Sequence, residues 1–478
     1  MKKVLIIMAV LPVIFLGACS VDSPEHPDDL KQVWGYMSLG NSLTAGFMDS
    51  GLYMPGQLGS FPRLIAGQMG IDTTFGGSDF TQPYVGFPGL GSSDPDTPGN
   101  IAGVLYYDGN GVDILGETPM QDVPQLLLAS SVPTPYHNLA VPGAFLIDVM
   151  HAFNIGSGHG ASIGQPNPFF LFINRVPVLF PNNSVEGPPA YESGSMFGQA
   201  VAKGAGIVTL WIGNNDVLGG ATEGSPVIGE NITDPGVFSA QYNTLLQALA
   251  EALVQRNGVP STIVVGNIPS ITDIPYFMTV QQFETAMGGT WEPGYEEDGS
   301  ASGMLVTLPA LSYGADHPDD PLPANYTLNH PEVTTVGNAV TAFNATISNA
   351  VATINQLYPG SCALFDANTM MAELPQERKT HFLFALDDPA NEGDPALAAA
   401  STYFSLDGVH PNQKGYGMIA NAFLVEINRL RGTSYPPVNL DDLTWDPLYG
   451  QEIVPVSGGK GGFHLSRAAG NALQNMAP

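Results

Sequence analysis

Three side chains in this sequence stand in contexts from which they could together hydrolyse an ester. Ser42 lies in the run GNSL at 40–43, where an apolar stretch gives way to a turn. Asp407 and His410 lie three residues apart in the run DGVHP. A turn at Gly408 would fold the Asp407 carboxylate back onto one ring nitrogen of His410. The other ring nitrogen would then be free to take a proton from a serine hydroxyl, which is how a serine nucleophile is activated.

Two further segments carry groups that could stabilise negative charge on a reacting carbonyl oxygen. Asn215 in GNND follows the apolar run 206–212, and its side-chain amide could donate a hydrogen bond to an oxyanion. Gly143 ends the run NLAVPG, and a glycine lets its backbone N–H approach a substrate closely. Taken singly, each segment also has an ordinary interpretation, as a helix cap, a turn or an exposed loop. Their order and their positions at the ends of predicted strands favour the catalytic interpretation.

The elements that would position these groups are alternating strands and helices. Apolar runs bounded by glycine or turn residues predict buried strands at residues 33–39, 136–140, 206–212, 262–265 and 362–365. Apolar residues at three- and four-residue steps predict helices at 238–255, 336–357 and 415–430, and a short helix begins at Ser42. This alternation predicts an α/β fold with a parallel sheet, whose reacting groups meet at the carboxyl ends of the strands.

The four segments resemble the sequence blocks of the SGNH (GDSL-type) serine hydrolases, an esterase and lipase family. The resemblance implies a flavodoxin-like α/β/α sandwich with a central parallel sheet. It also implies that Ser42 is the nucleophile and that Asp407 and His410 complete a catalytic triad. The oxyanion hole would comprise the Ser42 N–H, the Gly143 N–H and the Asn215 side chain. The run G-x-S-x-G is absent around Ser42, which argues against the ordinary α/β-hydrolase fold.

One residue departs from the family pattern. The family motif GDSLT reads GNSLT here, with Asn41 in place of the usual aspartate. Position 41 has none of the three triad roles, so we expect changed local hydrogen bonding rather than lost activity.

The amino terminus has the pattern of a targeting segment. Lys2 and Lys3 precede an apolar run, and the ending Leu-Gly-Ala-Cys resembles a bacterial lipobox. The resemblance implies a signal peptide over 1–18, lipidation of Cys19 and a polar tether over 19–32. We therefore expect a protein exported to the bacterial cell envelope and anchored in a membrane, with Ser20 favouring the outer membrane.

The remaining chain divides into a hydrolase domain over 33–432 and a tail over 433–478. Gly- and Pro-rich stretches without a sustained period predict insertions in the domain, at 48–125, 150–200 and 275–331. These insertions are expected to shape specificity. The apolar run 168–181 could line an acyl pocket or form a lid, or could simply pack in the interior. Cys362, the only other cysteine, is expected to be buried and unpaired.

Composition limits the partners of the protein. The 478 residues carry a formal charge of −30, which disfavours nucleic acid as a partner. We find no metal-binding or cofactor motif and expect neither. The sequence therefore predicts a serine-dependent carboxylic ester hydrolase that acts through an acyl-enzyme on a lipid or simple ester. Two alternatives stay open: a carbohydrate esterase that deacetylates glycans, and a non-catalytic surface binding lipoprotein.

Overall fold

The computed structural model describes residues 35–91, 97, 99–128, 135–171, 184–185, 191–192, 194–296, 303–447 and 465–474. The predicted signal peptide, the Cys19 lipidation site and the tether lie outside these residues, as does most of the run 168–181. They remain predictions from the sequence. Within the described part of the chain, no helix combines the length and apolar character needed to cross a membrane.

The centre of the molecule is a parallel sheet of four strands, in the order β1-β8-β9-β13. They are β1 (Tyr36–Gly40), β8 (Ile207–Trp211), β9 (Thr262–Gly266) and β13 (Cys362–Phe365). The segment around Asn138 runs parallel to the outer edge of β1, with hydrogen bonds from Ser38 N–H to the His137 carbonyl (2.8 Å) and from Leu139 N–H to the Ser38 carbonyl (2.9 Å). Counted with this segment, the strand order is 2-1-3-4-5, which is the flavodoxin-like order. The predicted fold class is confirmed.

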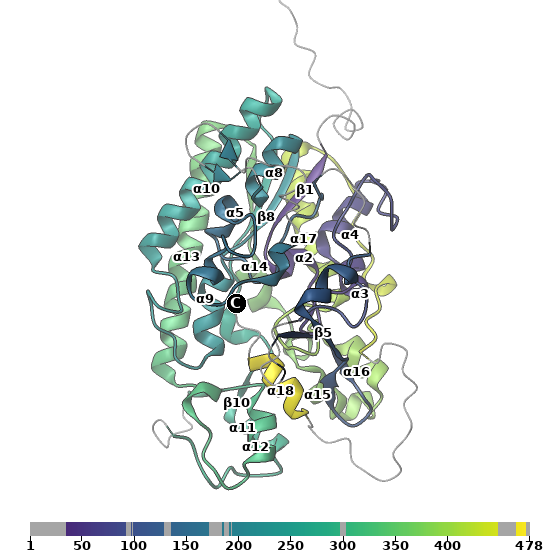
Figure 1. Cartoon of the computed structure of the whole chain (residues 1–478), viewed down its shortest axis with the longest axis vertical. Helices are drawn as coiled ribbons and strands as arrows, with labels where there is room; N and C mark the ends of the chain where they lie inside the picture. The colour runs from purple at the N-terminus through teal and green to yellow at the C-terminus, as the bar shows by residue number, and fades with distance from the viewer. Residues whose placement is uncertain are drawn as a thin grey trace, which may run out of the picture.

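Helices cover both faces of this sheet, as Figure 1 shows. Helices α8 (Met196–Lys203), α10 (Pro235–Asn257) and α13 (His330–Leu357) pack on one face, and α4 (Phe61–Gln68) and α17 (Gln413–Arg431) on the other. Along β8 the side chains alternate between the two cores, with Val208 and Leu210 on the first side and Trp211 on the second. Because both faces are buried, every residue of β8 is apolar or is a hydrogen-bonded threonine, which explains the unbroken apolar run in the sequence.

The long helices begin and end at residues that the sequence marks clearly. Asn329 caps α13 through a capping box with Glu332. Asn412 accepts hydrogen bonds from the first turn of α17, and Gly258 ends α10 in the left-handed conformation. Local capping thus supplements the burial of one apolar face, and the predicted helices at 238–255, 336–357 and 415–430 are confirmed.

The predicted insertions contain more regular structure than their composition suggests. Residues 48–125 include α4, whose Phe61 and Ile65 are fully buried between β1 and α17, so the prediction of a loop-rich segment missed a helix of the central core. The run is only eight residues long and begins with Phe-Pro, which left too short a period to recognise. Cys362 is buried and unpaired, as predicted, and burial raises the pKa of its thiol to about 12.

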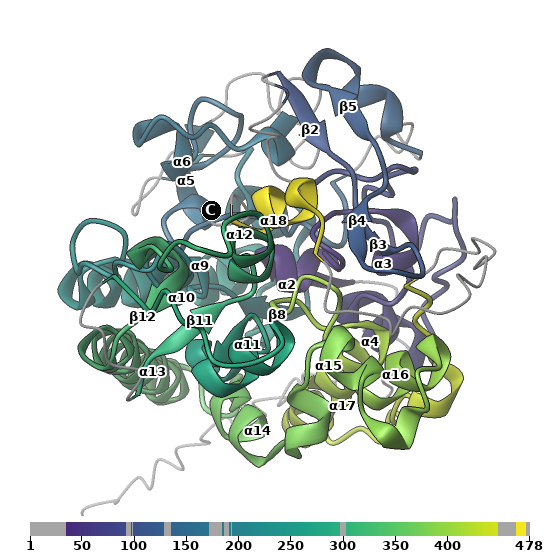
Figure 2. The same ribbon diagram turned by 90° about the horizontal axis from the view of Figure 1, so that it is seen from below.

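The other elements surround the sheet, and many of them lie beyond the carboxyl ends of its strands, at the lower end of Figure 1, which Figure 2 views directly. The helices among them are α2 (Ser42–Ala45), α3 (Met54–Leu58), α5 (Asp148–His151), α6 (His159–Ser162), α9 (Asn215–Thr222), α11 (Val280–Ala286), α12 (Ala310–Asp316), α14 (Ala367–Glu373), α15 (Phe382–Leu386), α16 (Pro395–Ser401) and α18 (Arg467–Gln474). The short strands are β2 (Asn100–Ala102), β3 (Leu105–Tyr107), β4 (Val112–Ile114), β5 (Glu117–Pro119), β6 (Ser184–Val185), β7 (Tyr191–Glu192), β10 (Phe277–Thr279), β11 (Leu305–Thr307) and β12 (Thr327–Leu328). Of these, β5, β10, α11, α12, α15, α16 and α18 lie beyond the end of the sheet that carries Ser42, whereas α5 packs against α8.

Candidate active site

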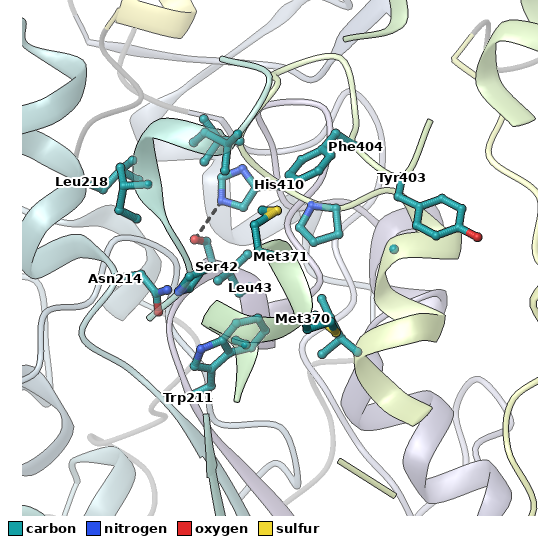
Figure 3. A pocket seen from close by; sticks show the side chains of 18 of the residues that line it. Ser42, Leu43, Trp211, Asn214, Leu218, Met370, Met371, Tyr403, Phe404 and His410 are labelled. Atoms are coloured by element: carbon teal, nitrogen blue, oxygen red, sulfur yellow. Dashed lines mark hydrogen bonds between the residues drawn. The ribbon is translucent and has the colours of Figure 1, made fainter. Parts of the chain in front are cut away.

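Ser42, His410 and Asp407 form a continuous hydrogen-bonded chain at the carboxyl end of the sheet. The Ser42 Oγ lies 2.8 Å from His410 Nε2, and His410 Nδ1 lies 3.0 Å from Asp407 Oδ2. Figure 3 shows the His410 ring directed at the serine hydroxyl. The three side chains are buried, with Ser42 the most exposed at 8%. An imidazole placed between a hydroxyl and a carboxylate can accept the hydroxyl proton and carry the resulting positive charge.

The local backbone brings these residues together. Ser42 is the first residue of α2, directly after β1, so its hydroxyl projects beyond the end of the sheet. Gly408 adopts the left-handed conformation (φ 70°), and a Cβ there would lie 2.8 Å from the Tyr276 backbone nitrogen. Only glycine fits this turn without strain. The turn folds Asp407 back onto His410 as the sequence predicted from their spacing.

The Asp407 carboxylate is prepared for the charged state. Its Oδ1 accepts the N–H groups of Val409 and His410, both at 2.8 Å, and its Oδ2 accepts the Ser50 N–H at 2.7 Å. Burial opposes ionisation, but the charge of His410 and these hydrogen bonds outweigh it, so the pKa of Asp407 lies below its ordinary value. The ring of Phe47 packs against His410 with centroids 4.7 Å apart. The imidazole is therefore held on both its edge and its face.

Two backbone N–H groups, one directly after β1 and one in the segment that lies along β1, are available for a ligand. The N–H groups of Ser42 and Gly143 have no hydrogen-bond acceptor among the described residues. Gly143 has a φ of 72° and follows the segment that lies along β1. The side-chain Nδ2 of Asn215 donates one hydrogen bond to the backbone carbonyl of Ala144, the residue after Gly143 (2.9 Å). The second hydrogen of this amide group is left for a ligand. The turn at 142–144 is thereby fixed against the start of α9.

Asp216 strengthens the same junction from the interior. Its carboxyl group accepts the Leu146 N–H and the Thr233 hydroxyl, each at 2.9 Å. Burial raises the pKa of Asp216 to about 7, against the opposing effect of these hydrogen bonds. Asp216 thus contributes to the site by anchoring the segment that carries Gly143.

Asn41 has a defined structural role. Its Oδ1 accepts the Leu43 N–H (3.2 Å) as the cap of α2, and its Nδ2 donates to Asn214 Oδ1 (3.3 Å). An aspartate at this position could not donate to that oxygen. The Asn214 Nδ2 is buried and has no hydrogen-bond partner in the described part of the chain. The sequence singled out Asn215 alone, but Asn214 also lines the pocket described next.

An apolar pocket opens beside the Ser42 hydroxyl. It lies at the ends of β8, β9 and β13 and spans about 740 Å³, a volume that includes space open to solvent. Its polar lining is confined to the Ser42 end, apart from Tyr403, whose hydroxyl points away from Ser42 in Figure 3. The apolar lining comes from α9, the loop after β9, α14, the loop before α17 and α17 itself, including Leu218, Ile271, Ile274, Met370, Met371, Leu374, Phe404, Met418 and Ile419.

Sequence reasoning missed most of this pocket. Its apolar residues come from five separate segments, and no motif marks them. The run 168–181 was the predicted candidate for an acyl lining. In its described portion, Phe169 and Phe170 are buried, and Phe169 packs on Phe47, which in turn contacts His410. Among the residues that the structure describes, no cluster of three or more His, Cys, Asp or Glu side chains could hold a metal ion.

The fold and the site define the class of protein. The sheet reverses its strand order between β1 and β8, and in open α/β sheets ligands bind at such a switch point. Ser42 follows β1 and Asn215 follows β8, so the site occupies this position.

The sequence from residue 36 to residue 423 matches the model of the GDSL-like lipase/acylhydrolase family, and the chain belongs to this family. It is therefore a hydrolase of ester substrates. A search of curated proteins found no match to the chain.

Proposed function

We propose that the protein is a serine carboxylic ester hydrolase with Ser42 as its nucleophile. In the acylation half-reaction, Ser42 Oγ attacks the ester carbonyl carbon while its proton passes to His410 Nε2. The ionised Asp407 stabilises the imidazolium that forms. When the tetrahedral intermediate collapses, the bond to the alcohol oxygen breaks and His410 protonates the leaving alcohol.

Deacylation repeats these steps with water. His410 takes a proton from the water molecule as it attacks the acyl-enzyme, and the carboxylic acid product leaves as the proton returns to Ser42. In both half-reactions the N–H groups of Ser42 and Gly143 and the amide of Asn215 hold the oxyanion. Support for this assignment comes from the free N–H groups and from the second, uncommitted hydrogen of Asn215 Nδ2.

The apolar pocket is the observation that favours a substrate with a long acyl chain. Each buried CH₂ group of a ligand contributes about 0.8 kcal/mol, so the pocket rewards every added methylene until it is filled. The pocket therefore favours a lipid or long-chain ester over the deacetylation of glycans. A lipid anchor at Cys19, as the sequence predicts, would hold such an enzyme at a membrane surface.

A chain-length series of p-nitrophenyl esters tests the acyl preference. We expect kcat/KM to rise from acetate to octanoate by at least about tenfold, because each methylene adds binding energy in the pocket. Met370→Trp should move the optimum towards shorter chains, since Met370 is a half-buried pocket residue on α14. Ala372→Trp places the same side chain at an exposed position of that helix and serves as the control. A strict preference for acetate in the wild-type enzyme would contradict the lipid-ester proposal.

A pair of variants separates the two neighbouring asparagines. Asn215→Ala is expected to lower kcat by about 10²–10³-fold, the usual loss for one oxyanion donor, with a smaller change in KM. Asn214→Ala removes the acceptor of Asn41 but not the proposed donor, and its kcat should fall less. Steady-state kinetics on one ester measures both. The reverse ranking would transfer the donor role to Asn214.

A further inference from the structure

A buried turn seven residues after Ser42 is an unusual feature of this fold. Met48 and Gly51 pair through two backbone hydrogen bonds (3.0 and 3.1 Å), so Asp49 and Ser50 form a two-residue hairpin turn. Both have positive φ, 55° and 59°, a conformation that is strained in residues other than glycine. Such turns usually lie at the surface and contain Asn-Gly, but here Asp49 is 0% and Ser50 2% exposed.

The turn contacts three successive residues that end with the triad acid. The Asp49 N–H donates to Ser405 Oγ (3.0 Å), and Asp49 Oδ1 accepts the Leu406 N–H (3.0 Å). The Ser50 N–H donates to Asp407 Oδ2 at 2.7 Å. This is the same carboxylate oxygen that accepts the hydrogen bond of the catalytic imidazole. The positive φ of both turn residues directs the N–H groups of Asp49 and Ser50 and the Asp49 carboxylate at residues 405–407 of the facing loop.

The Asp49 carboxylate is itself held in place from two other segments. Its Oδ2 accepts the Tyr53 hydroxyl (2.6 Å) and the Trp445 indole N–H (3.1 Å). Trp445 belongs to the predicted tail at 433–478, so residues after α17 reach the site from the far end of the chain. On the opposite side, the Leu406 carbonyl contacts His381 Nε2 at 2.8 Å. The backbone of Leu406, the residue before Asp407, is thus held at both its N–H and its carbonyl.

We propose that Asp49 is a positioning residue for the triad, which fixes Asp407 through Leu406 and through the Ser50 N–H so that the carboxylate faces His410. The turn lies on the segment that carries Ser42 and binds the loop that carries the acid and the base. It therefore joins the nucleophile to its activating pair across 357 residues of sequence. This inference rests on the proposed function, since it assigns a role toward the same triad.

The expected consequence is a change in the basicity of His410, beyond any loss of stability. In the native protein the two carboxylate oxygens of Asp49 accept hydrogen bonds from three groups, the Leu406 N–H, the Tyr53 hydroxyl and the Trp445 indole N–H. The side chain of Asp49→Asn has only one acceptor oxygen, so at least one of these donors loses its partner. The Asp407 loop then holds its carboxylate less firmly against the imidazole. A weaker contact stabilises the imidazolium less, so the acidic limb of the kcat/KM profile should move to lower pH.

The experiment compares pH–rate profiles of the full-length wild type, Asp49→Asn and Asp234→Asn. Asp234 caps α10 at an exposed position by accepting the N–H groups of Gly236 and Val237, so its variant makes the same chemical change without touching the triad. We expect Asp49→Asn to lose about 10–100-fold in kcat, as for other groups that orient a functional histidine. Its KM should change little, and its acidic limb should shift down by about half a unit or more. The Asp234→Asn profile should match that of the wild type.

A second variant keeps the inference testable if Asp49→Asn does not fold. Ser405→Ala removes only the acceptor of the Asp49 N–H and leaves the buried carboxylate intact. It should shift the acidic limb in the same direction by a smaller amount, with a loss of a few fold in kcat. An unshifted limb in Ser405→Ala, or in a folded Asp49→Asn, would overturn the positioning role. Failure of the proposed function is distinguishable from this result, because the wild type would then show no Ser42-dependent turnover.

Discussion

Replacing Ser42 with alanine is expected to lower kcat for ester hydrolysis by about 10⁶-fold, the loss that follows removal of the nucleophile in a serine protease such as subtilisin. The change removes the proposed nucleophile, the hydroxyl that lies 2.8 Å from His410 Nε2. The folded state should persist, because Ser42 contributes one hydrogen bond worth about 1 kcal/mol and its Cβ remains. Steady-state turnover of a p-nitrophenyl ester and thermal unfolding together measure both effects.

Ser195→Ala is the matched control for this variant. Ser195 is also a buried serine, but its hydroxyl caps α8 by accepting the Gly198 N–H. We expect its loss to cost about 1 kcal/mol of unfolding free energy and to leave kcat unchanged. Measurable turnover in purified Ser42→Ala would mean that another residue is the nucleophile.

Asp407→Asn should have the second-largest effect, a loss of about 10⁴-fold in kcat near neutral pH. The asparagine would have one acceptor oxygen where the carboxylate uses two. If the amide NH₂ takes the place of Oδ2, it faces the Ser50 N–H and donates a hydrogen bond to His410 Nδ1. The neutral imidazole must then carry its own proton on Nε2. An imidazole in that tautomer cannot accept the proton of Ser42.

The opposite amide orientation does not rescue the variant. The NH₂ group would then face the N–H groups of Val409 and His410, which both donate to Asp407 Oδ1 in the native protein. Either way buried donors lose their partner, so the free energy of unfolding should fall by about 1–3 kcal/mol as well. The measurement is kcat across the pH range together with thermal unfolding. Activity within tenfold of the wild type would exclude Asp407 as the partner of His410.

The sequence allowed the fold and much of the site to be predicted because both depend on local patterns. Buried parallel strands such as β8 read as unbroken apolar runs, and helices such as α13 carry their caps in the sequence. The Asp407–His410 pair needs only a glycine turn, so a three-residue spacing was enough to suggest it. The alternation of strands and helices predicts a parallel sheet covered by helices, and the resemblance to the SGNH hydrolases implied its flavodoxin-like order.

The parts that sequence reasoning missed depend on contacts between distant segments. Asp49 and Ser50 read as an ordinary Gly-rich loop, and their role emerges only where they meet Leu406 and Asp407. The apolar pocket likewise draws single residues from several elements, each of which would read as core packing by itself. Helix α4 was missed because eight residues carry too weak a period. Signals of this kind become visible only once the chain is folded.

The measurement that tests the central claim most directly is covalent labelling with a fluorophosphonate, followed by peptide mapping. Such a probe reacts with a serine only when a neighbouring base activates it, so structural serines remain unmodified. We predict one labelled peptide, with the added mass on Ser42, and no labelling in Ser42→Ala. Labelling of a different serine, or none in an enzyme that hydrolyses esters, would contradict the account.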